Sequence, residues 1–155
     1  MSLRRSDPDA ALADGAPFRV LPLVDDSNRG FWTSGADGVL RFSRCQACGY
    51  RLHPPGPRCP ECGGRELAWE PVSGLGEVFS YTVNHQPWDG STEPWVVVLV
   101  ALPEQDGLRL TSNLYGVEPD EVRIGLPVRV VFEQHDDVWF PVFEPADRPP
   151  DRAAP

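Results

Sequence analysis

Four cysteines within one short stretch constrain this chain more than any other feature of its sequence. The stretch reads CQACGYRLHPPGPRCPECGG, from Cys45 to Gly64, and contains two Cys-x-x-Cys pairs separated by ten residues. Each pair can direct two sulfur atoms at one ion, so two pairs supply the closed tetrahedral shell of a structural metal site. Gly49 and Gly63 follow the pairs and permit the tight backbone that each turn needs. The pattern predicts a metal ion bound by Cys45, Cys48, Cys59 and Cys62, rather than disulfides.

The identity of the metal depends on what lies between the pairs. CQACGY and CPECGG resemble the knuckles of rubredoxin, which bind iron and carry electrons. The intervening segment is far shorter here and lacks the aromatic residues that enclose the iron of rubredoxins. Four sulfur ligands also leave no position for an activated water. We therefore expect structural Zn²⁺, which replaces a core that about 30 residues cannot build alone, with an iron-binding electron carrier as the alternative.

The charge of the chain is negative overall and positive around the cysteines. The formal net charge is −9 and lysine is absent, which argues against a nucleic-acid binder and excludes Schiff-base and P-loop chemistry on a lysine of this chain. Residues 41–65 nevertheless contain five arginines against the single acidic residue Glu61. These arginines are Arg41, Arg44, Arg51, Arg58 and Arg65. We expect a mildly positive ribbon on a negative body.

No apolar run approaches the roughly 20 residues that a membrane helix needs. The first residues, MSLRRSDPDAALADGAPF, lack the apolar core of a signal peptide. These two observations predict a cytoplasmic protein without a membrane partner, and reduced cysteines fit that compartment.

Composition divides the chain into five parts. Residues 1–17 and 146–155 are rich in Ala, Asp and Pro and are predicted to be disordered. Residues 18–40 are predicted to form a helical arm and a lead-in strand, with Asp25, Asp26 or Ser27 as the helix cap. The metal ribbon is expected over residues 41–68 and a barrel over residues 69–145.

Five strands are predicted in the barrel region. GEVFSYTVNH alternates, PWVVVLVAL is a continuous apolar run typical of a strand buried on both faces, and LRLTSNLYG forms a hairpin with it. A short helical turn in EPDEVRIGLP precedes VRVVFEQH and VWFPVFEP. The predicted fold class is all-β: a short N-terminal helix and a rubredoxin-like zinc ribbon, followed by a five-stranded OB-fold barrel. The aromatic residues expected to fill this barrel are Phe79, Tyr81, Phe132, Trp139, Phe140 and Phe143.

The remaining candidates are histidines and isolated aromatic residues. His53 is expected to bond a backbone group rather than to act as an acid or base, and His135 is expected on the surface. His85, at a strand end, is the better functional candidate, with a solvated loop residue as the default interpretation. Three aromatic residues, Phe31, Trp32 and Trp88, do not fit the strand pattern. Either they pack locally or they anchor a partner protein, because exposed aromatic residues are frequent interface hot spots.

Five segments together resemble a known family, over residues 20–145. They are GFWTSGADGVLRFSRCQACG, HPPGPRCPECGG, WEPVSGLGEVFSYTVNH, and RIGLPVRVVFE followed by PVFEP. The chain is similar in them to small acyl-CoA-associated proteins that combine a rubredoxin-like zinc ribbon with an OB domain. All four ligand positions of that family are filled here.

The resemblance implies a non-catalytic accessory subunit in a hetero-oligomer with a thiolase-like enzyme of the lipid-transfer-protein type. Members of the family accompany enzymes that cleave steroid acyl-CoA side chains by retro-aldol chemistry, accompany other thiolases, or are fused to hydratase domains. It also implies a role for Arg41, Arg44, Arg51 and Arg58, which suit coenzyme A phosphates or partner carboxylates. Solubility alone is the alternative explanation for these arginines. An OB-fold nucleic-acid binder is the alternative for the whole chain.

Overall fold

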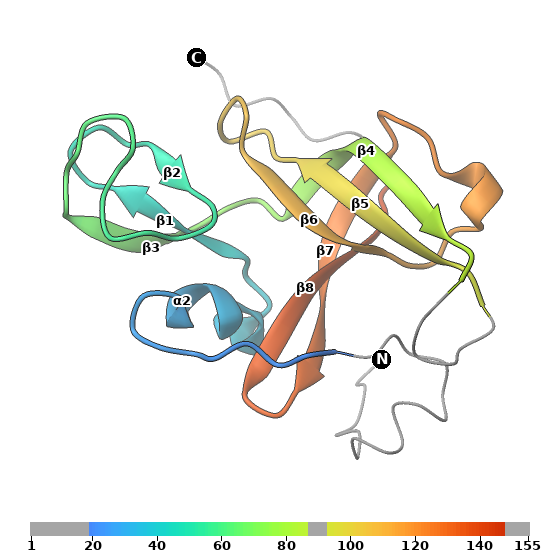
Figure 1. Cartoon of the computed structure of the whole chain (residues 1–155). Helices are drawn as coiled ribbons and strands as arrows, with labels where there is room; N and C mark the ends of the chain where they lie inside the picture. Colours follow the sequence, from blue (N-terminus) through green and yellow to red (C-terminus); the bar gives the residue numbers. More distant parts are fainter. Residues whose placement is uncertain (1–18, 87–92, 148–155) are drawn as a thin grey trace.

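The computed structural model describes residues 19–86 and 93–147, which form two β-sheets with a short helical segment packed beside them (Figure 1). The expected all-β fold class is confirmed. The predictions of disorder fall on residues outside this description, except at Ala146 and Asp147. The Ala146 amide donates to the Pro127 carbonyl at 2.9 Å, so the chain is still bound to the barrel there. No helix in the described ranges is long and apolar enough to cross a membrane.

A four-residue helix, α2 (Arg29–Trp32), and a 3₁₀ turn, η1 (Ser34–Asp37), precede the first strand. The cap differs from the prediction, because Asn28 occupies the N-cap position. The Asp25 carboxylate instead accepts a hydrogen bond from the Ser27 amide in the preceding turn. Close packing explains why glycine, a poor helix former, occupies position 30 of α2. A Cβ atom there would collide with the Trp69 ring, so glycine allows α2 to approach the ribbon closely.

The ribbon contains a three-stranded antiparallel sheet in the order β2-β1-β3. Its strands are β1 (Arg41–Cys45), β2 (Arg51–Leu52) and β3 (Leu67–Pro71). The register places Phe42 opposite Glu70 and Ser43 opposite both Trp69 and Leu52. The sheet is small, and no residue of β3 is fully buried.

The second sheet is a closed barrel in the order β4-β5-β6-β8-β7, in which β7 pairs back onto β4. All neighbours are antiparallel except β6 and β8, which pair in parallel where Leu114 meets Phe143. The 3₁₀ turn η2 (Pro119–Glu121) lies between the third and fourth barrel strands, as expected for an OB-fold. The barrel strands are β4 (Leu75–Asn84), β5 (Trp95–Ala101), β6 (Arg109–Leu114), β7 (Pro127–His135) and β8 (Val138–Pro145).

The aromatic residues follow the predicted pattern only in part. Phe143 is fully buried and Phe132 packs against the core, as expected. Phe79 and Tyr81 are 45% and 40% exposed, so the prediction that they fill the barrel is wrong. A β-bulge between Val78 and Ser80 interrupts the alternation, and Val78 takes the buried position.

Two aromatic residues of β8 pack outside the barrel interior. Phe140 meets Trp32 of α2 edge-on, with ring centroids 5.3 Å apart, and Trp139 contacts Gly35 of η1. They fasten the N-terminal helical segment to the barrel. A sequence pattern cannot distinguish this role from barrel filling, because both require an apolar ring on a strand.

The apolar run in β5 is buried on one face only. Val96, Val98 and Val100 are buried, whereas the residues between them are half-exposed. A strand of a small barrel has one face toward the interior and one outside, which explains why the expectation of a doubly buried strand is wrong.

One apolar cluster joins the ribbon side to the barrel. It includes Phe31, Leu40 and Phe42 from the N-terminal part, together with Val100, Val128 and Phe143 from the barrel. Polar contacts reinforce the junction, because the Arg51 amide donates to Gln105 Oε1 at 2.6 Å and Gln105 Nε2 donates back to the Arg51 carbonyl at 3.0 Å. The inner end of the ribbon is therefore built into the barrel.

Candidate metal centre and neighbouring cavity

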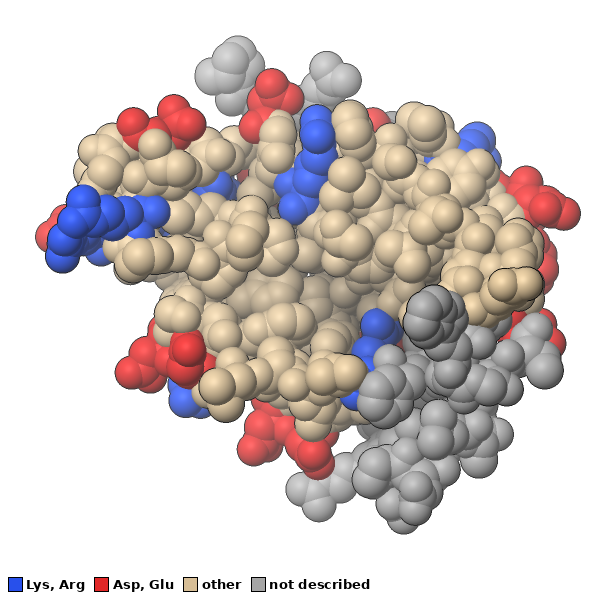
Figure 2. Space-filling view, viewed as in Figure 1, with Lys and Arg blue, Asp and Glu red and all other residues tan. Residues whose placement is uncertain are grey.

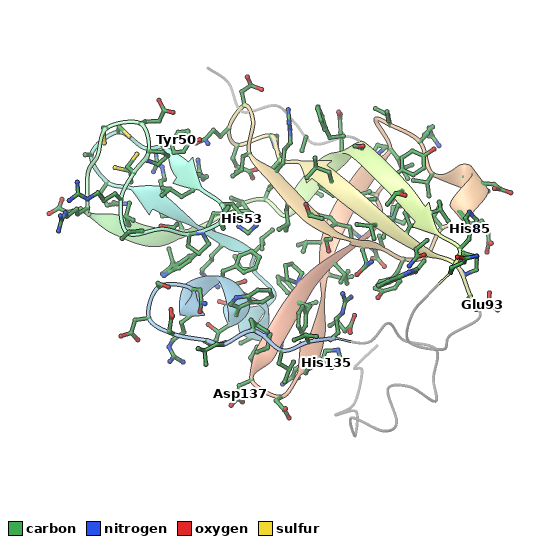
Figure 3. The ribbon with its side chains drawn as sticks, in the orientation of Figure 1. Tyr50, His53, His85, Glu93, His135 and Asp137 are labelled. Carbon is green, nitrogen blue, oxygen red and sulfur yellow. The ribbon has the colours of Figure 1, made fainter. Side chains whose placement is uncertain are left out.

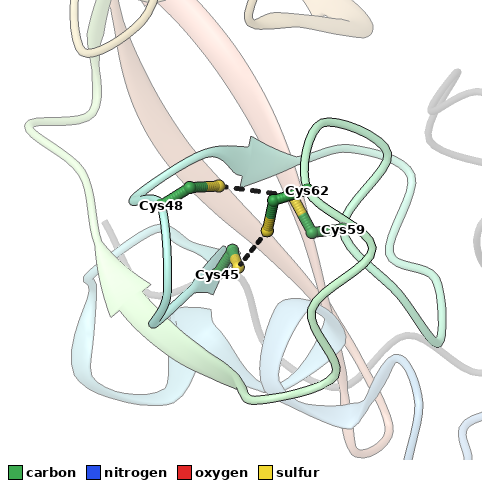
Figure 4. Close-up of side chains that lie close together, drawn as sticks. All are labelled: Cys45, Cys48, Cys59 and Cys62. Atoms are coloured by element: carbon green, nitrogen blue, oxygen red, sulfur yellow. Dashed lines mark hydrogen bonds between the residues drawn. The ribbon is translucent and has the colours of Figure 1, made fainter.

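The four cysteines lie together at the outer end of the ribbon (Figure 4). Cys45 ends β1, Cys48 follows in the next turn, and the other pair lies in the loop between β2 and β3. All four sulfur atoms lie within 4.8 Å of one another, and none is in a disulfide. The Sγ atoms of Cys45 and Cys62 are 3.6 Å apart, and those of Cys48 and Cys59 are 3.5 Å apart. A zinc tetrathiolate with Zn–S bonds of about 2.3 Å has sulfurs about 3.8 Å apart, so the donor set fits such an ion.

Both cysteine pairs form the same tight turn. The Gly49 amide donates to the Cys45 carbonyl at 2.8 Å, and the Gly63 amide donates to the Cys59 carbonyl at 2.9 Å. Both glycines have a positive φ, 80° and 73°, which residues other than glycine rarely adopt. The predicted role of these two glycines is confirmed.

The electrostatics of the cluster favour a cation. The backbone amides of Cys48 and Ala47 lower the pKa of the Cys45 thiol to about 7. The Tyr50 amide also favours the Cys48 thiolate, but the contact with Cys62, burial and the other two sulfurs raise the pKa of Cys48 to about 12. One thiolate therefore opposes the formation of the next. Because metal ligation requires thiolates, a divalent cation is the group that would allow all four to ionise together.

Two of the predicted arginines are engaged within the chain. Arg41 contacts the Asp37 carboxylate at 2.6 Å and lowers its pKa to about 2. Arg44 contacts the Glu70 carboxylate at 2.8 Å and donates to the Gly49 carbonyl at 3.0 Å, which ties β1 to β3 and to the first cysteine turn.

The other arginines are less engaged. Arg51 is half-buried, and its Nε has no hydrogen-bond partner within the described ranges. Arg58 and Arg65 are exposed, and Figure 2 shows arginine side chains at the outer end of the ribbon. The prediction that arginines bind phosphate or carboxylate groups therefore applies most directly to Arg58.

The predicted aromatic anchors occupy different environments. Phe31 is only 4% exposed, and its ring packs against Trp32, Phe42 and His53, as the local-packing alternative expects. Trp32 is half-buried between Phe31 and the barrel. Trp88 lies outside the described residues. Contact of these three residues with a partner stays a prediction.

His53 is a packed, neutral histidine rather than a backbone-bonded one. Its ring packs against both Phe31 and Phe42, with centroids 5.0 and 5.1 Å away, and its buried Nδ1 has no partner in the part of the chain that is described. Burial lowers the pKa of His53 to about 4. Nδ1 therefore does not make the backbone hydrogen bond that was expected of His53.

The other two histidines lie on the barrel. His85 is exposed at the end of β4, far from the ribbon (Figure 3). His135 was expected on the surface, but it is mostly buried, with an ion pair to Glu133 and an edge-on contact to Phe140. No contact in the described ranges brings His85 toward the cysteines or toward His53.

A cavity of about 470 Å³ lies where the N-terminal segment, the turn after β2 and the barrel meet. Figure 2 shows the hollow between the ribbon and the helical segment. Its walls are mixed: aromatic and proline side chains provide apolar surface, and hydroxyl, amide and imidazole groups provide polar surface. Residues that line it include Arg19, Asn28, His53, Ser112, Phe140 and Val142.

Arg19 is a residue that the sequence did not reveal. Its guanidinium donates to Asn113 at 2.7 Å, to the Tyr115 hydroxyl at 3.2 Å and to the Glu133 carboxylate at 3.1 Å. These partners lie 94 to 114 positions away in the chain. No local pattern connects residues so distant.

Two family descriptions match adjoining parts of the chain. Residues 32–68 match the rubredoxin-like zinc ribbon domain of ChsH2, and residues 69–133 match the C-terminal OB-fold domain of ChsH2. Together the two matches cover the cysteine site and most of the barrel.

Curated relatives place the same unit in several settings. The probable enoyl-CoA hydratase alpha subunit of Thermomonospora curvata is 39% identical over 131 residues, which are 83% of this chain and 40% of the relative. This chain thus spans about two fifths of that relative's length. A DUF35 domain-containing scaffold protein of Methanothermobacter thermautotrophicus is 37% identical over 98 residues, 61% of this chain and 72% of the relative. The benzoylsuccinyl-CoA thiolase subunit BbsA of Thauera aromatica is 32% identical over 111 residues, 66% of this chain and 74% of the relative.

A solved structure extends the likeness to three dimensions. A chain of the Ltp2-ChsH2(DUF35) aldolase superposes with a TM-score of 0.69 and 40% identity, covering 81% of this chain and 98% of that one. The ribbon, the barrel and the cysteine pattern point to the same group of proteins. The chain belongs to the DUF35 family and carries its ChsH2-type zinc ribbon and OB-fold domains.

Proposed function

We propose that this chain is a non-catalytic accessory subunit that binds and stabilises a thiolase-fold enzyme of the lipid-transfer-protein type. The complex cleaves the acyl-CoA side chain of a steroid by retro-aldol chemistry, in lipid and sterol catabolism in the cytoplasm. The observation that carries this proposal is the likeness to a chain of the Ltp2-ChsH2(DUF35) aldolase, at 40% identity over 98% of that chain. The similarity to a thiolase subunit and to a scaffold protein supports a role beside an enzyme.

In this proposal the four cysteines hold one structural Zn²⁺. The support is the donor set: four sulfur atoms within 4.8 Å of one another, with no other ligand type in the cluster. A shell filled by sulfur provides a fixed fold and no open coordination position. The ion stabilises the outer end of the ribbon, and the shared apolar cluster connects the inner end of the ribbon to the barrel. Metal analysis tests this choice, since a zinc protein is colourless and an iron tetrathiolate absorbs visible light.

A partner of the enoyl-CoA hydratase class is the second candidate. The support is the 39% identity to the Thermomonospora curvata alpha subunit, of which this chain spans about two fifths. Binding assays with both classes of enzyme separate the candidates.

Co-expression with a thiolase-fold enzyme encoded by a gene beside that of this chain tests the proposal. We expect the two chains to co-elute, the enzyme to be more soluble and more active with this chain, and this chain alone to turn over no acyl-CoA. Unaided turnover of an acyl thioester by this chain would overturn the accessory role. An enzyme that keeps full solubility and activity without this chain would do the same.

The nucleic-acid alternative has its own assay. The net charge of −9 and the internal pairing of Arg41 and Arg44 argue against a basic binding groove. We expect only weak oligonucleotide binding that disappears with salt. Tight binding at physiological salt would favour the OB-fold nucleic-acid binder instead.

A further inference from the structure

The segment of residues 19–24, called the arm below, presents apolar side chains to solvent. Val20 is 76% exposed and Leu23 is 88% exposed, with Leu21 also exposed between them. These are three of the six large hydrophobic residues that are exposed in the described part of the chain. Single exposed apolar residues are ordinary, but three within four consecutive positions form a local patch that marks an interaction site.

The arm is fastened to the barrel at its first residue. The Arg19 guanidinium is held by Asn113, Tyr115 and Glu133, and it lies 5.2 Å from the centroid of the Phe140 ring. Both members of the ion pair with Glu133 are largely buried. Burial would raise the pKa of Glu133, but the hydrogen bonds from Arg19 and His135 lower it overall, so the carboxylate is charged at neutral pH.

The arm is fastened again where it enters α2. The side chain of Asn28 donates to the Leu23 carbonyl at 3.0 Å and accepts the Asp25 amide at 2.9 Å. Between these two anchors, the backbone groups of Val20, Leu21 and Val24 make no hydrogen bond to any described residue. A segment fixed at both ends with free backbone groups is pre-organised to pair with an extended segment of another chain.

The surface beside the arm is concave. Arg19 and Asn28, which anchor the arm, also line the cavity of about 470 Å³. A protruding apolar segment next to a hollow gives a surface that can interlock with a partner. At its far end the arm meets two exposed carboxylates, Asp25 and Asp26, on a chain of net charge −9.

We propose that the arm is the element by which this chain docks on its enzyme partner. Val20 and Leu23 insert into an apolar groove of that partner, and the free backbone of the arm pairs with an extended segment there. The groove carries arginine or lysine at the end that faces Asp25 and Asp26, because like charges would oppose binding. This inference rests on the proposed function and adds to it the surface that makes contact.

Binding affinity of arm variants tests the inference. The probe is the thiolase-fold enzyme recovered with the wild-type chain in the co-expression experiment. We expect Val20→Asp combined with Leu23→Asp to raise the Kd at least a hundredfold, and Arg19→Ala to raise it about tenfold because the arm loses one anchor. The double aspartate variant should keep the melting temperature and metal content of the wild type within error, since both apolar side chains are exposed. Arg19→Ala should keep the metal content but lower the melting temperature, because it leaves the largely buried Glu133 carboxylate without its ion-pair partner.

Ile124→Asp is the matched control. Ile124 is 71% exposed, in the turn between η2 and β7, so this variant also replaces an exposed apolar side chain by a carboxylate. We expect an unchanged Kd. An arm double variant that binds as tightly as this control would overturn the inference and leave the proposed function standing.

Two further outcomes are decisive. A wild-type chain that binds no thiolase-fold enzyme overturns the proposed function, and the docking with it. A wild-type chain that dimerises through the arm, so that the aspartate variants abolish the dimer and leave enzyme binding intact, assigns the arm to a second copy and also overturns the inference. Analytical ultracentrifugation of each variant, alone and with the enzyme, separates these results.

Discussion

The ribbon and the barrel are stabilised in different ways although they are adjacent in one short chain. The ribbon has three short strands, and every residue of β3 is at least partly exposed. The barrel has five strands that close on themselves around a continuous apolar cluster. Burial of apolar area is sufficient for the barrel, whereas the ribbon has four sulfur ligands where its core would be. The comparison teaches that metal ligation substitutes for burial in a segment too short to bury much.

The two regions share a boundary, which limits how independent they can be. Phe31, Leu40 and Phe42 belong to the same cluster as the barrel core, and Arg51 exchanges hydrogen bonds with Gln105. We therefore expect the outer end of the ribbon to depend on the metal and its inner end to depend on the barrel.

The largest expected effect comes from removal of one sulfur ligand. Structural zinc contributes on the order of 10–16 kcal/mol of apparent binding free energy in zinc-finger peptides. Cys48→Ser should therefore abolish metal binding and unfold the outer ribbon, while β4 to β8 remain folded. Hydrogen exchange followed by mass spectrometry should show fast exchange in the two cysteine turns, at residues 45–49 and 59–64, and unchanged protection in the barrel.

Ala47→Ser is the control for this comparison. Ala47 lies in the same turn and is exposed, but it offers no ligand of the cluster. The control should exchange as the wild type does. Equal loss of protection in the ribbon and the barrel of Cys48→Ser would show that the barrel depends on the metal as much as the ribbon does.

The second prediction breaks the barrel instead. Phe143 is fully buried, and Phe→Ala in a core costs about 3–5 kcal/mol. Phe143→Ala should lower the free energy of unfolding by that amount in urea titrations, whereas Phe79→Ala at an exposed position should cost much less. The metal should stay bound in the folded fraction of both variants. A similar loss of stability in the two variants would contradict the assignment of the core.

The third prediction concerns pH and the boundary between the regions. His53 has a pKa of about 4 in the fold against an ordinary value of 6.5, because burial disfavours the charged ring. Between these values the unfolded chain binds a proton that the folded chain does not, so stability falls as pH decreases from 6.5 toward 4. The loss amounts to roughly 3 kcal/mol.

Variants isolate this contribution. Urea titrations from pH 7 to pH 4 should show a shallower decline in His53→Leu than in the wild type, since the rings packed on His53 belong to Phe31 and Phe42 and do not titrate. A decline that is the same in His53→Leu and in the wild type would contradict the buried, neutral state of His53.

The smallest expected effect sharpens the same boundary. Gly30→Ala would place a Cβ atom against the Trp69 ring. The collision would push α2 away from the ribbon. Overpacking of this kind costs about 1–3 kcal/mol. Gly56→Ala is the control, because a Cβ atom there meets nothing within 4 Å. Thermal unfolding should rank the variants accordingly, and equal melting temperatures would show that α2 does not pack tightly on Trp69.

Local patterns in the sequence predicted the parts of the molecule that depend on local geometry. The spacing of the cysteines predicted a cluster that the structure shows, because a Cys-x-x-Cys turn sets where its two sulfurs lie. The strand pattern predicted a small all-β barrel, and the short helical turn before β7 pointed to an OB-fold.

Features that depend on distant residues escaped prediction. The bulge between Val78 and Ser80 changes the alternation within β4, and the period of the apolar residues did not reveal it. His53 is buried by rings from α2 and β1, and Arg19 is held by residues about a hundred positions away. Arg41 and Arg44 look available in the sequence, and the fold pairs them with Asp37 and Glu70. Side-chain partners of this kind are decided by tertiary packing.

Ligation of one metal by all four sulfurs is the claim on which the comparison of the two regions depends. Metal analysis of the purified chain, combined with X-ray absorption at the metal edge, measures it directly. The expected result is one zinc per chain with four sulfur ligands at about 2.3 Å. A metal-free chain whose ribbon amides are still protected from exchange would contradict it.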